Sequence, residues 1–106
     1  MPTKVIASHE VEVNDEGFFV DAEQWTEEMA PELADEYGVP TPLTDQHWTV
    51  IRYMRSEYFE HGTGPTVRKL GKASGVTTKE LFALFPKGPA KLAAHCAGIP
   101  KPRGCI

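Results

Sequence analysis

The spacing of glycine and proline restricts the helices of this 106-residue chain to short ones. Apolar residues recur at helical intervals in several segments, and each segment stops at Gly38, Gly62, Gly75, Pro86 or Gly98. Glycine ends helices because it readily adopts left-handed backbone angles, and proline ends them because the residue before it disfavours helical angles. The pattern therefore predicts about five short helices.

Capping residues indicate where several of these helices begin. Asp21 with Gln24, and Thr77 with Glu80, have the spacing of a capping box, and Thr44 is the expected N-cap of the longest helix. That helix carries one apolar stripe, which is most simply a core face: Trp48, Ile51, Met54 and Tyr58. The helix after Asp21 contains Pro31, so we expect it to be short or kinked.

A β-hairpin is predicted ahead of the helices, at about residues 5–20. Val11 and Val13 alternate with polar residues, the pattern breaks at residues 14–17, and apolar residues resume at Phe18. Within residues 64–85, a helix with Pro65 at a first helical position precedes the Thr77 helix, and the two have the dimensions of a helix-turn-helix. The expected fold class is therefore mainly α, with an N-terminal hairpin.

The chain has no linker, so we predict one domain at residues 1–98, with helices at about 22–98, and a C-terminal arm at 99–106. Pro100 and Pro102 favour an extended arm, because each fixes one backbone angle and removes a donor. Eight residues would span on the order of 25 Å. With Gly104 as a joint, the arm would present Cys105 outward.

Charge is divided unevenly along the chain. Residues 1–61 hold three Lys or Arg against fourteen carboxylates, whereas residues 62–106 hold eight against one. The basic half could attract an acidic protein surface, a small anion or nucleic acid. No segment has the length of a membrane span, the first residues lack a signal-peptide pattern, and two cysteines do not make a disulfide scaffold, so we expect a cytoplasmic protein with free thiols.

The two cysteines are the candidate reactive residues. Lys101 and Arg103 lie close to Cys105 and favour its thiolate, although a cysteine near a chain end can also be inert. Cys96 reads as a small buried apolar residue among alanines, or as a second thiol that meets Cys105. Neither a zinc-ligand spacing nor a phosphate-binding loop is present, so we expect no metal and no bound cofactor.

Four segments carry a family resemblance: "DEGFFVDAEQW", "LTDQHWTVIRYMRSEYFEHGTGPTVRKL", "LFPKGPAK" and "AGIPKPRGCI". Over residues 10–106 the chain resembles the DsrC/TusE family, small proteins associated with dissimilatory sulfite reductase or with tRNA thiolation. The resemblance implies an orthogonal bundle of helices and a mobile arm. It also implies that Cys105 carries sulfur as a persulfide, and that Arg68 and Lys101 stabilise the anionic sulfur.

The chain departs from this family at its second thiol. Sulfite-reductase-associated members carry a cysteine that aligns with Ala94, and Cys96 lies two residues later, a rotation of about 200° on a helix. A lone Cys105 is typical of the thiolation members, but the short loop before "LFPKGPAK" is typical of the sulfite-reductase group. The sequence therefore leaves both pathways open.

Three functions follow as hypotheses. The leading one is a sulfur carrier with donor and acceptor partner proteins, sulfite reductase among the candidates, acting as a covalent co-substrate without independent turnover. The second is a redox switch between Cys96 and Cys105. The third is a DNA-binding helix-turn-helix whose basic residues contact phosphates: Arg68, Lys69, Lys72 and Lys79. The second helix of that pair offers mainly apolar side chains that we expect in the core: Leu81, Phe82, Leu84 and Phe85.

Overall fold

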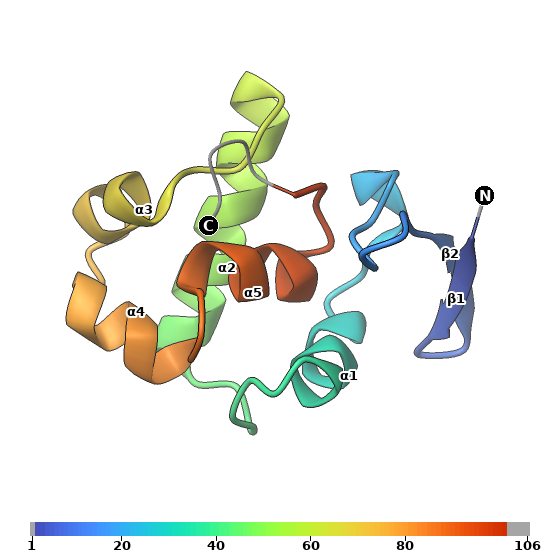
Figure 1. Cartoon of the computed structure of the whole chain (residues 1–106), viewed down its shortest axis with the longest axis horizontal. Helices are drawn as coiled ribbons and strands as arrows, with labels where there is room; N and C mark the ends of the chain where they lie inside the picture. Colours follow the sequence, from blue (N-terminus) through green and yellow to red (C-terminus); the bar gives the residue numbers. More distant parts are fainter. Residues whose placement is uncertain (1, 102–106) are drawn as a thin grey trace.

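A computed structural model describes residues 2–101 of the chain. Within them it has a two-stranded sheet, one 3₁₀ turn and five α-helices (Figure 1): β1 (Thr3–Ile6), β2 (His9–Glu12), η1 (Ala22–Gln24), α1 (Met29–Glu36), α2 (Asp45–His61), α3 (Val67–Ala73), α4 (Thr78–Leu84) and α5 (Pro89–Ala97). The predicted fold class, a mainly α bundle with an N-terminal hairpin, is confirmed.

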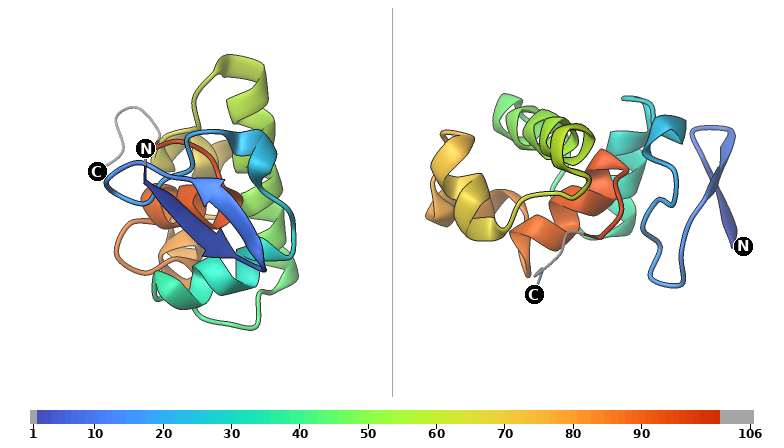
Figure 2. Two further views of the ribbon diagram at one scale, coloured as in Figure 1. Left: turned by 90° about the vertical axis from the view of Figure 1, so that its right-hand side faces the viewer. Right: turned by 90° about the horizontal axis from the view of Figure 1, so that it is seen from above.

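Helix α5 lies in the middle of the bundle. It packs mainly against α2 and α1, and it crosses α2 steeply, as expected of an orthogonal bundle (Figure 1). The α3–α4 pair lies at one end of the molecule and the hairpin at the other (Figure 2). The last helix of the chain is therefore surrounded by elements from both halves of the sequence.

The hairpin lies earlier in the chain than the sequence pattern indicated. β1 and β2 pair antiparallel from Thr3 with Glu12 to Ile6 with His9. Their turn is Ala7-Ser8, where both residues have positive φ angles of 49° and 68°, and such turns match the twist of two strands. This pair lacks the Gly or Asn that usually signals the turn. The predicted turn at 14–17 also forms, but it leads only to a single bridge between Val13 and Phe19.

The helix predicted after Asp21 is split in two. Asp21 accepts a hydrogen bond from the Glu23 amide and caps η1, but Gln24 does not close a capping box, because its side-chain oxygen accepts from the Glu12 amide of β2 at 2.8 Å. The α-helix begins only at Met29. Pro31 therefore falls in the first turn of α1, where its missing N–H has no partner to lose, and the helix is short rather than kinked.

The other predicted helix ends largely hold. Thr44 caps α2 in a capping box that uses His47 as its third residue, and Thr77 caps α4 with Glu80. Pro65 is not a first helical residue, because the Thr66 hydroxyl accepts from the Lys69 amide and makes Thr66 the N-cap of α3. Helices α3 and α4 are seven residues each and pack against one another, within the residues where the helix-turn-helix-like pair was predicted.

The main core lies between α5, α2, α1 and the α3–α4 pair. Ile51 and Met54 of the predicted α2 stripe are fully buried, together with Leu81 and Phe85. Phe82, which we expected in the core, is 51% exposed. It follows Leu81 by one residue, so the helix turns it away from the buried face. None of the helices within residues 2–101 combines the length and the apolar character that crossing a membrane requires.

Candidate functional site at the end of helix α5

Helix α5 is rich in small residues, and its C-terminal end lies at the candidate site. Pro89 occupies the first helical position, and Ala90, Ala93, Ala94 and Ala97 are buried along the helix. Small side chains let α5 lie close to its neighbours, which explains its central place. Gly98 ends the helix in a left-handed conformation with φ of 64°. The direction of residues 99–101 is therefore set by the interior of the bundle.

Two side chains hold the last carbonyl groups of α5. The indole Nε1 of Trp25 donates to the carbonyl of Cys96 at 2.9 Å. Nη1 of Arg55 donates to the carbonyl of Ala97 at 2.8 Å, and its Nη2 donates to the carbonyl of Ala22 at 3.1 Å. Carbonyls at a helix C-terminus lack partners inside the helix and favour a nearby cation. Trp25 and Arg55 therefore fix the point at which the chain leaves α5.

Arg55 is half-buried and is held between aromatic rings. Its guanidinium lies 4.3 Å from the centroid of Trp25 and 5.0 Å from that of Phe59. Burial lowers the pKa of Arg55, but an arginine remains a cation in a protein. It forms no ion pair with a carboxylate in the described part of the chain. The sequence analysis counted Arg55 only as a charge, because its carbonyl partners come from distant segments.

The predicted arm begins inside the fold. Ile99 is fully buried, so the core extends one residue beyond the expected boundary at 98, and Pro100 is half-buried. Nζ of Lys101 lies 3.2 Å from Oε2 of Glu16, in the turn at 14–17. Both side chains of this pair are exposed, and such pairs contribute little stability. Lys101 is therefore positioned by the turn at 14–17 but can exchange partners.

Arg68 lies on the exposed side of α3. Within residues 2–101 it forms no hydrogen bond or ion pair, and the partner of Lys101 is Glu16. The structure thus leaves its guanidinium available to a ligand. The neighbouring Lys69 is already engaged, because its Nζ lies 2.6 Å from Oε1 of Glu57.

Cys96 lies in the core rather than at the surface. Its side chain is fully buried within the main hydrophobic cluster, and burial raises its pKa to about 12. A buried apolar setting keeps a thiol protonated and unreactive. The geometry corresponds to the interpretation of Cys96 as a small packing residue.

His95 precedes Cys96 and occupies a narrow slot. Its ring is stacked between Phe18 and Tyr37, with both centroid separations at 3.8 Å. Its Nδ1 is buried without a hydrogen-bond partner in the described residues. Burial, followed by the charges of Lys91 and Lys4, lowers the pKa of His95 to about 4. The ring is therefore neutral at physiological pH and joins α5 to the N-terminal segments.

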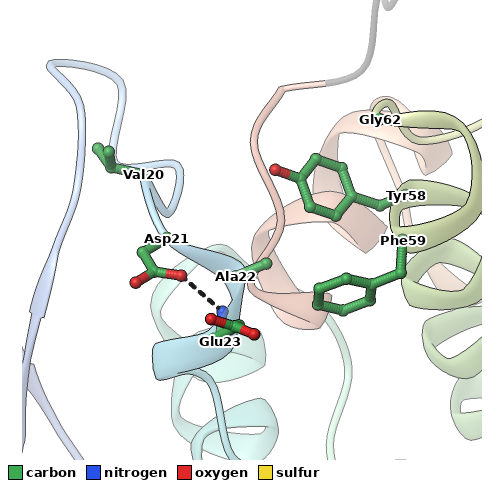
Figure 3. A pocket seen from close by; sticks show the side chains of 7 residues that line it. All are labelled: Val20, Asp21, Ala22, Glu23, Tyr58, Phe59 and Gly62. Atoms are coloured by element: carbon green, nitrogen blue, oxygen red, sulfur yellow. Dashed lines mark hydrogen bonds between the residues drawn. The ribbon is translucent and has the colours of Figure 1, made fainter.

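A surface groove of about 350 Å³ lies beside this end of α5 (Figure 3). It is lined by residues of η1 and its approach and by the last turn of α2: Val20, Asp21, Ala22, Glu23, Tyr58, Phe59 and Gly62. Arg55 connects the groove to the candidate site, since it binds the carbonyls of both Ala22 and Ala97 and contacts Phe59. Arg55 therefore holds both the groove, at Ala22, and the end of α5, at Ala97, where the arm begins.

Comparison with known proteins places this geometry in a family. Residues 5–106 match the family described as "DsrC like protein". The chain belongs to the DsrC-like family. A protein named sulfurtransferase TusE, from Pectobacterium atrosepticum, is 42% identical over 98 residues, covering 86% of this chain and 88% of that protein.

Solved structures agree with this family at the level of the whole fold. The crystal structure of dissimilatory sulfite reductase I has a TM-score of 0.85 at 32% identity, covering 99% of this chain and 100% of that one. The NMR structure of Allochromatium vinosum DsrC has a TM-score of 0.82 at 35% identity, with 98% and 97% covered. The DsrC-like fold therefore spans essentially the whole described chain.

The predicted site of this DsrC-like chain is only partly within the described residues. Cys96, Arg68 and Lys101 have been located above, whereas Cys105 and Arg103 lie outside residues 2–101. No hydrogen bond or ion pair joins any two of these three located residues. Their roles toward sulfur remain predictions.

One cluster in this DsrC-like chain has the composition of a metal site. Ligand atoms of Glu57, Glu60 and His61 lie within 4.8 Å of one another. The hydrogen bond from Lys69 is the main cause that lowers the pKa of Glu57, so the buried carboxylate already has a cation as its partner. The cluster is explained as an ion-pair network that joins α2 to α3.

Proposed function

We propose that this DsrC-like chain is a sulfur carrier, in which Cys105 accepts sulfane sulfur as a persulfide and delivers it to a partner enzyme. The burial of Cys96 carries this proposal, because it removes the second cysteine from the surface and leaves Cys105 as the thiol available for exchange. The names of the relatives, sulfurtransferase TusE and the gamma-subunit of a dissimilatory sulfite reductase, support chemistry at sulfur.

The proposed transfer needs no oxidant. The Cys105 thiolate attacks the terminal sulfur of a donor persulfide, a new S–S bond forms, and the donor's S–S bond breaks. The electron pair of the broken bond leaves with the donor's inner sulfur. That sulfur takes up the proton of the transferred persulfide, so the donor becomes a thiol and Cys105 carries an anionic persulfide. Delivery repeats the step: an acceptor thiolate takes the terminal sulfur and Cys105 is released as a thiolate.

Basic side chains would stabilise the anionic persulfide in this proposal. Lys101 and Arg103 precede Cys105 by four and two residues in the sequence, and Arg68 has no hydrogen-bond or ion-pair partner within residues 2–101. The weak pair between Lys101 and Glu16 can open when a stronger anion approaches. These three cations also favour the thiolate over the thiol before loading.

Burial of the second thiol also bears on the choice of pathway. A reaction that bridges two cysteines of one chain requires Cys96 to leave the core, which costs its packing and that of α5. We therefore favour transfer from one single-thiol carrier to the next protein of a relay. The redox-switch hypothesis needs the same movement of Cys96 and has no feature of the described fold in its favour.

Persulfide loading tests the proposal directly. The protein is incubated with glutathione persulfide, and the masses of the intact chain and of its C-terminal peptide are measured. We expect one added sulfur atom on the peptide that contains Cys105, abolished by Cys105→Ser and retained by Cys96→Ala. If Cys105→Ser gains as much sulfur as the parent, the arm is not the carrier.

A further inference from the structure

The groove beside α5 contains large apolar side chains that are not buried in the core. Four large apolar side chains are notably exposed within residues 2–101, and two of them, Val20 and Phe59, line this groove. Phe59 is 54% exposed, and the Tyr58 ring lies beside it at a centroid separation of 5.4 Å (Figure 3). Apolar side chains gathered in one surface hollow are typical of an interaction site.

The charged side chains that line the groove are all acidic. Asp21 and Glu23 are exposed, and neither forms an ion pair with a cation in the described part of the chain. Arg55 lies against Phe59, but its guanidinium donors bind the carbonyls of Ala97 and Ala22. Asp21 caps η1 through the Glu23 amide, but neither carboxylate has a cationic partner within residues 2–101. Two such carboxylates next to aromatic rings form an environment that attracts a guanidinium or ammonium group.

The position of the groove relates it to sulfur transfer. Arg55 holds both the groove residue Ala22 and the last residue of α5, Ala97, so the arm leaves the fold next to the groove. Figure 3 shows the chain after α5 passing Ala22 and Tyr58. A protein that contacts residues 99–101, where the arm begins, can therefore also reach the groove.

We propose that the groove binds a segment of the sulfur-exchanging partner protein that carries Arg or Lys next to apolar side chains. The inference rests on the proposed function and identifies the kind of partner surface that it requires. The apolar side chains would cover Val20 and Phe59, and the cation would lie between Glu23 and the aromatic rings. Charge complementarity would speed the encounter, and the small apolar contact would allow release after transfer.

The size of the groove favours this partner over a second copy of the chain. Its lining comprises seven residues, whereas a stable interface uses about 20–30 residues on each side. A contact of this extent fits a transient complex between relay proteins. The basic half of a second copy would also satisfy the charge, so the oligomeric state forms part of the test.

The test uses two synthetic 12-residue peptides on the isotopically labelled full chain. One peptide alternates Arg with Leu and Trp, and the other has Glu in place of each Arg. We expect the basic peptide to shift the amide resonances of residues 20–23 and 58–62 at low ionic strength, and to lose affinity as salt is added. The acidic peptide should cause no such shifts.

A second groove provides the matched control. It is also acidic and apolar, lies between β1 and α1, and contains Glu32 but no aromatic ring. We expect Glu23→Lys to weaken binding of the basic peptide about five-fold, the upper end of the range for one exposed ion pair. Glu32→Lys, with the same change in net charge, should alter the affinity by less than about two-fold. Phe59→Ala should also weaken binding.

Three results would overturn the inference: equal binding of both peptides, shifts centred on the Glu32 groove, or a parent dimer in sedimentation that Glu23→Lys dissociates. The last result would assign the groove to a second copy. Loading of the parent with glutathione persulfide is measured in parallel without peptide. If the parent loads sulfur at Cys105 but the peptides do not bind as expected, the proposed function stands and the groove proposal is wrong.

Discussion

The indole ring of Trp25 packs against the backbone of Gly98, in the space that any Cβ at position 98 would occupy. Gly98 also has a φ of 64°, so two separate constraints require glycine there. Trp25 follows η1, near the N-terminal side of the molecule, and Gly98 ends α5. The end of α5, where the arm begins, is therefore held by a segment more than seventy residues away in the sequence.

Substitution of Gly98 should separate these two constraints. We expect Gly98→Ala to lower the free energy of unfolding by about 3 kcal/mol, combining left-handed strain with an overlap against Trp25. Gly62→Ala is the control: Gly62 has a φ of 79° and open space around its Cα, so we expect only about 1 kcal/mol. Urea denaturation measures both variants, and equal losses would show that the contact with Trp25 contributes nothing.

Removal of the Arg55 guanidinium should release the end of α5. Arg55→Gln leaves two buried carbonyls without their charged donor, and we expect a loss of about 3 kcal/mol in unfolding free energy. Arg52→Gln, about one turn earlier, removes an exposed pair with Glu27 and an exposed contact with the Trp48 ring, and should cost less than about 1 kcal/mol. Comparable losses for the two variants would contradict the role assigned to Arg55.

The buried ring of His95 should make stability fall in mild acid. Its pKa is about 4 in the fold and 6.5 when exposed, so between these values the unfolded chain binds more protons than the folded one. The contribution is complete above pH 6.5 and declines as the pH falls toward 4. The full change is on the order of 3 kcal/mol.

Thermal unfolding measured from pH 7 to pH 5 tests this expectation, because most carboxylates remain charged in that range. We expect His95→Gln to be less stable than the parent at pH 7, since it loses its stacking, but to show a flatter dependence on pH. His61→Gln, at a half-exposed position on α2, should keep the slope of the parent. A parent without a slope would refute the prediction.

Thiol labelling should distinguish the two cysteines. With a pKa of about 12 and no exposed surface, Cys96 should resist iodoacetamide at pH 8 in the folded protein and react fully in urea. Cys105 should react under both conditions. Mass spectrometry of the two cysteine peptides measures this, and rapid native labelling of Cys96 would revive the redox-switch hypothesis.

Local patterns predicted much of the fold because their causes are local. Thr44 and Thr77 cap the helices that the sequence assigned to them, and Gly62 and Gly98 end theirs. The failures occur where a distant partner decides the outcome. Gln24 binds Glu12 of β2 instead of closing a capping box, and the hairpin turns at Ala7-Ser8 without a turn residue to mark it.

The candidate site shows the same limit more strongly. Composition and spacing indicated that Cys96 lies among alanines, and its burial follows from that setting. The sequence gives no sign that Arg55 serves the end of α5, because its acceptors are backbone carbonyls of Ala97 and Ala22. Carbonyl groups are present at every position, so no residue pattern distinguishes the ones that a guanidinium will bind.

The burial of Ile99 limits how deep a partner's reaction centre can lie. Cys105 is six residues beyond this fixed point, which allows at most about 20 Å of extended chain. While Lys101 remains paired with Glu16, the distance is counted from Lys101 over four residues, and the limit falls to about 13 Å. If the reactive sulfur of an acceptor lies deeper than this shorter limit, the pair between Lys101 and Glu16 must open before Cys105 can reach it.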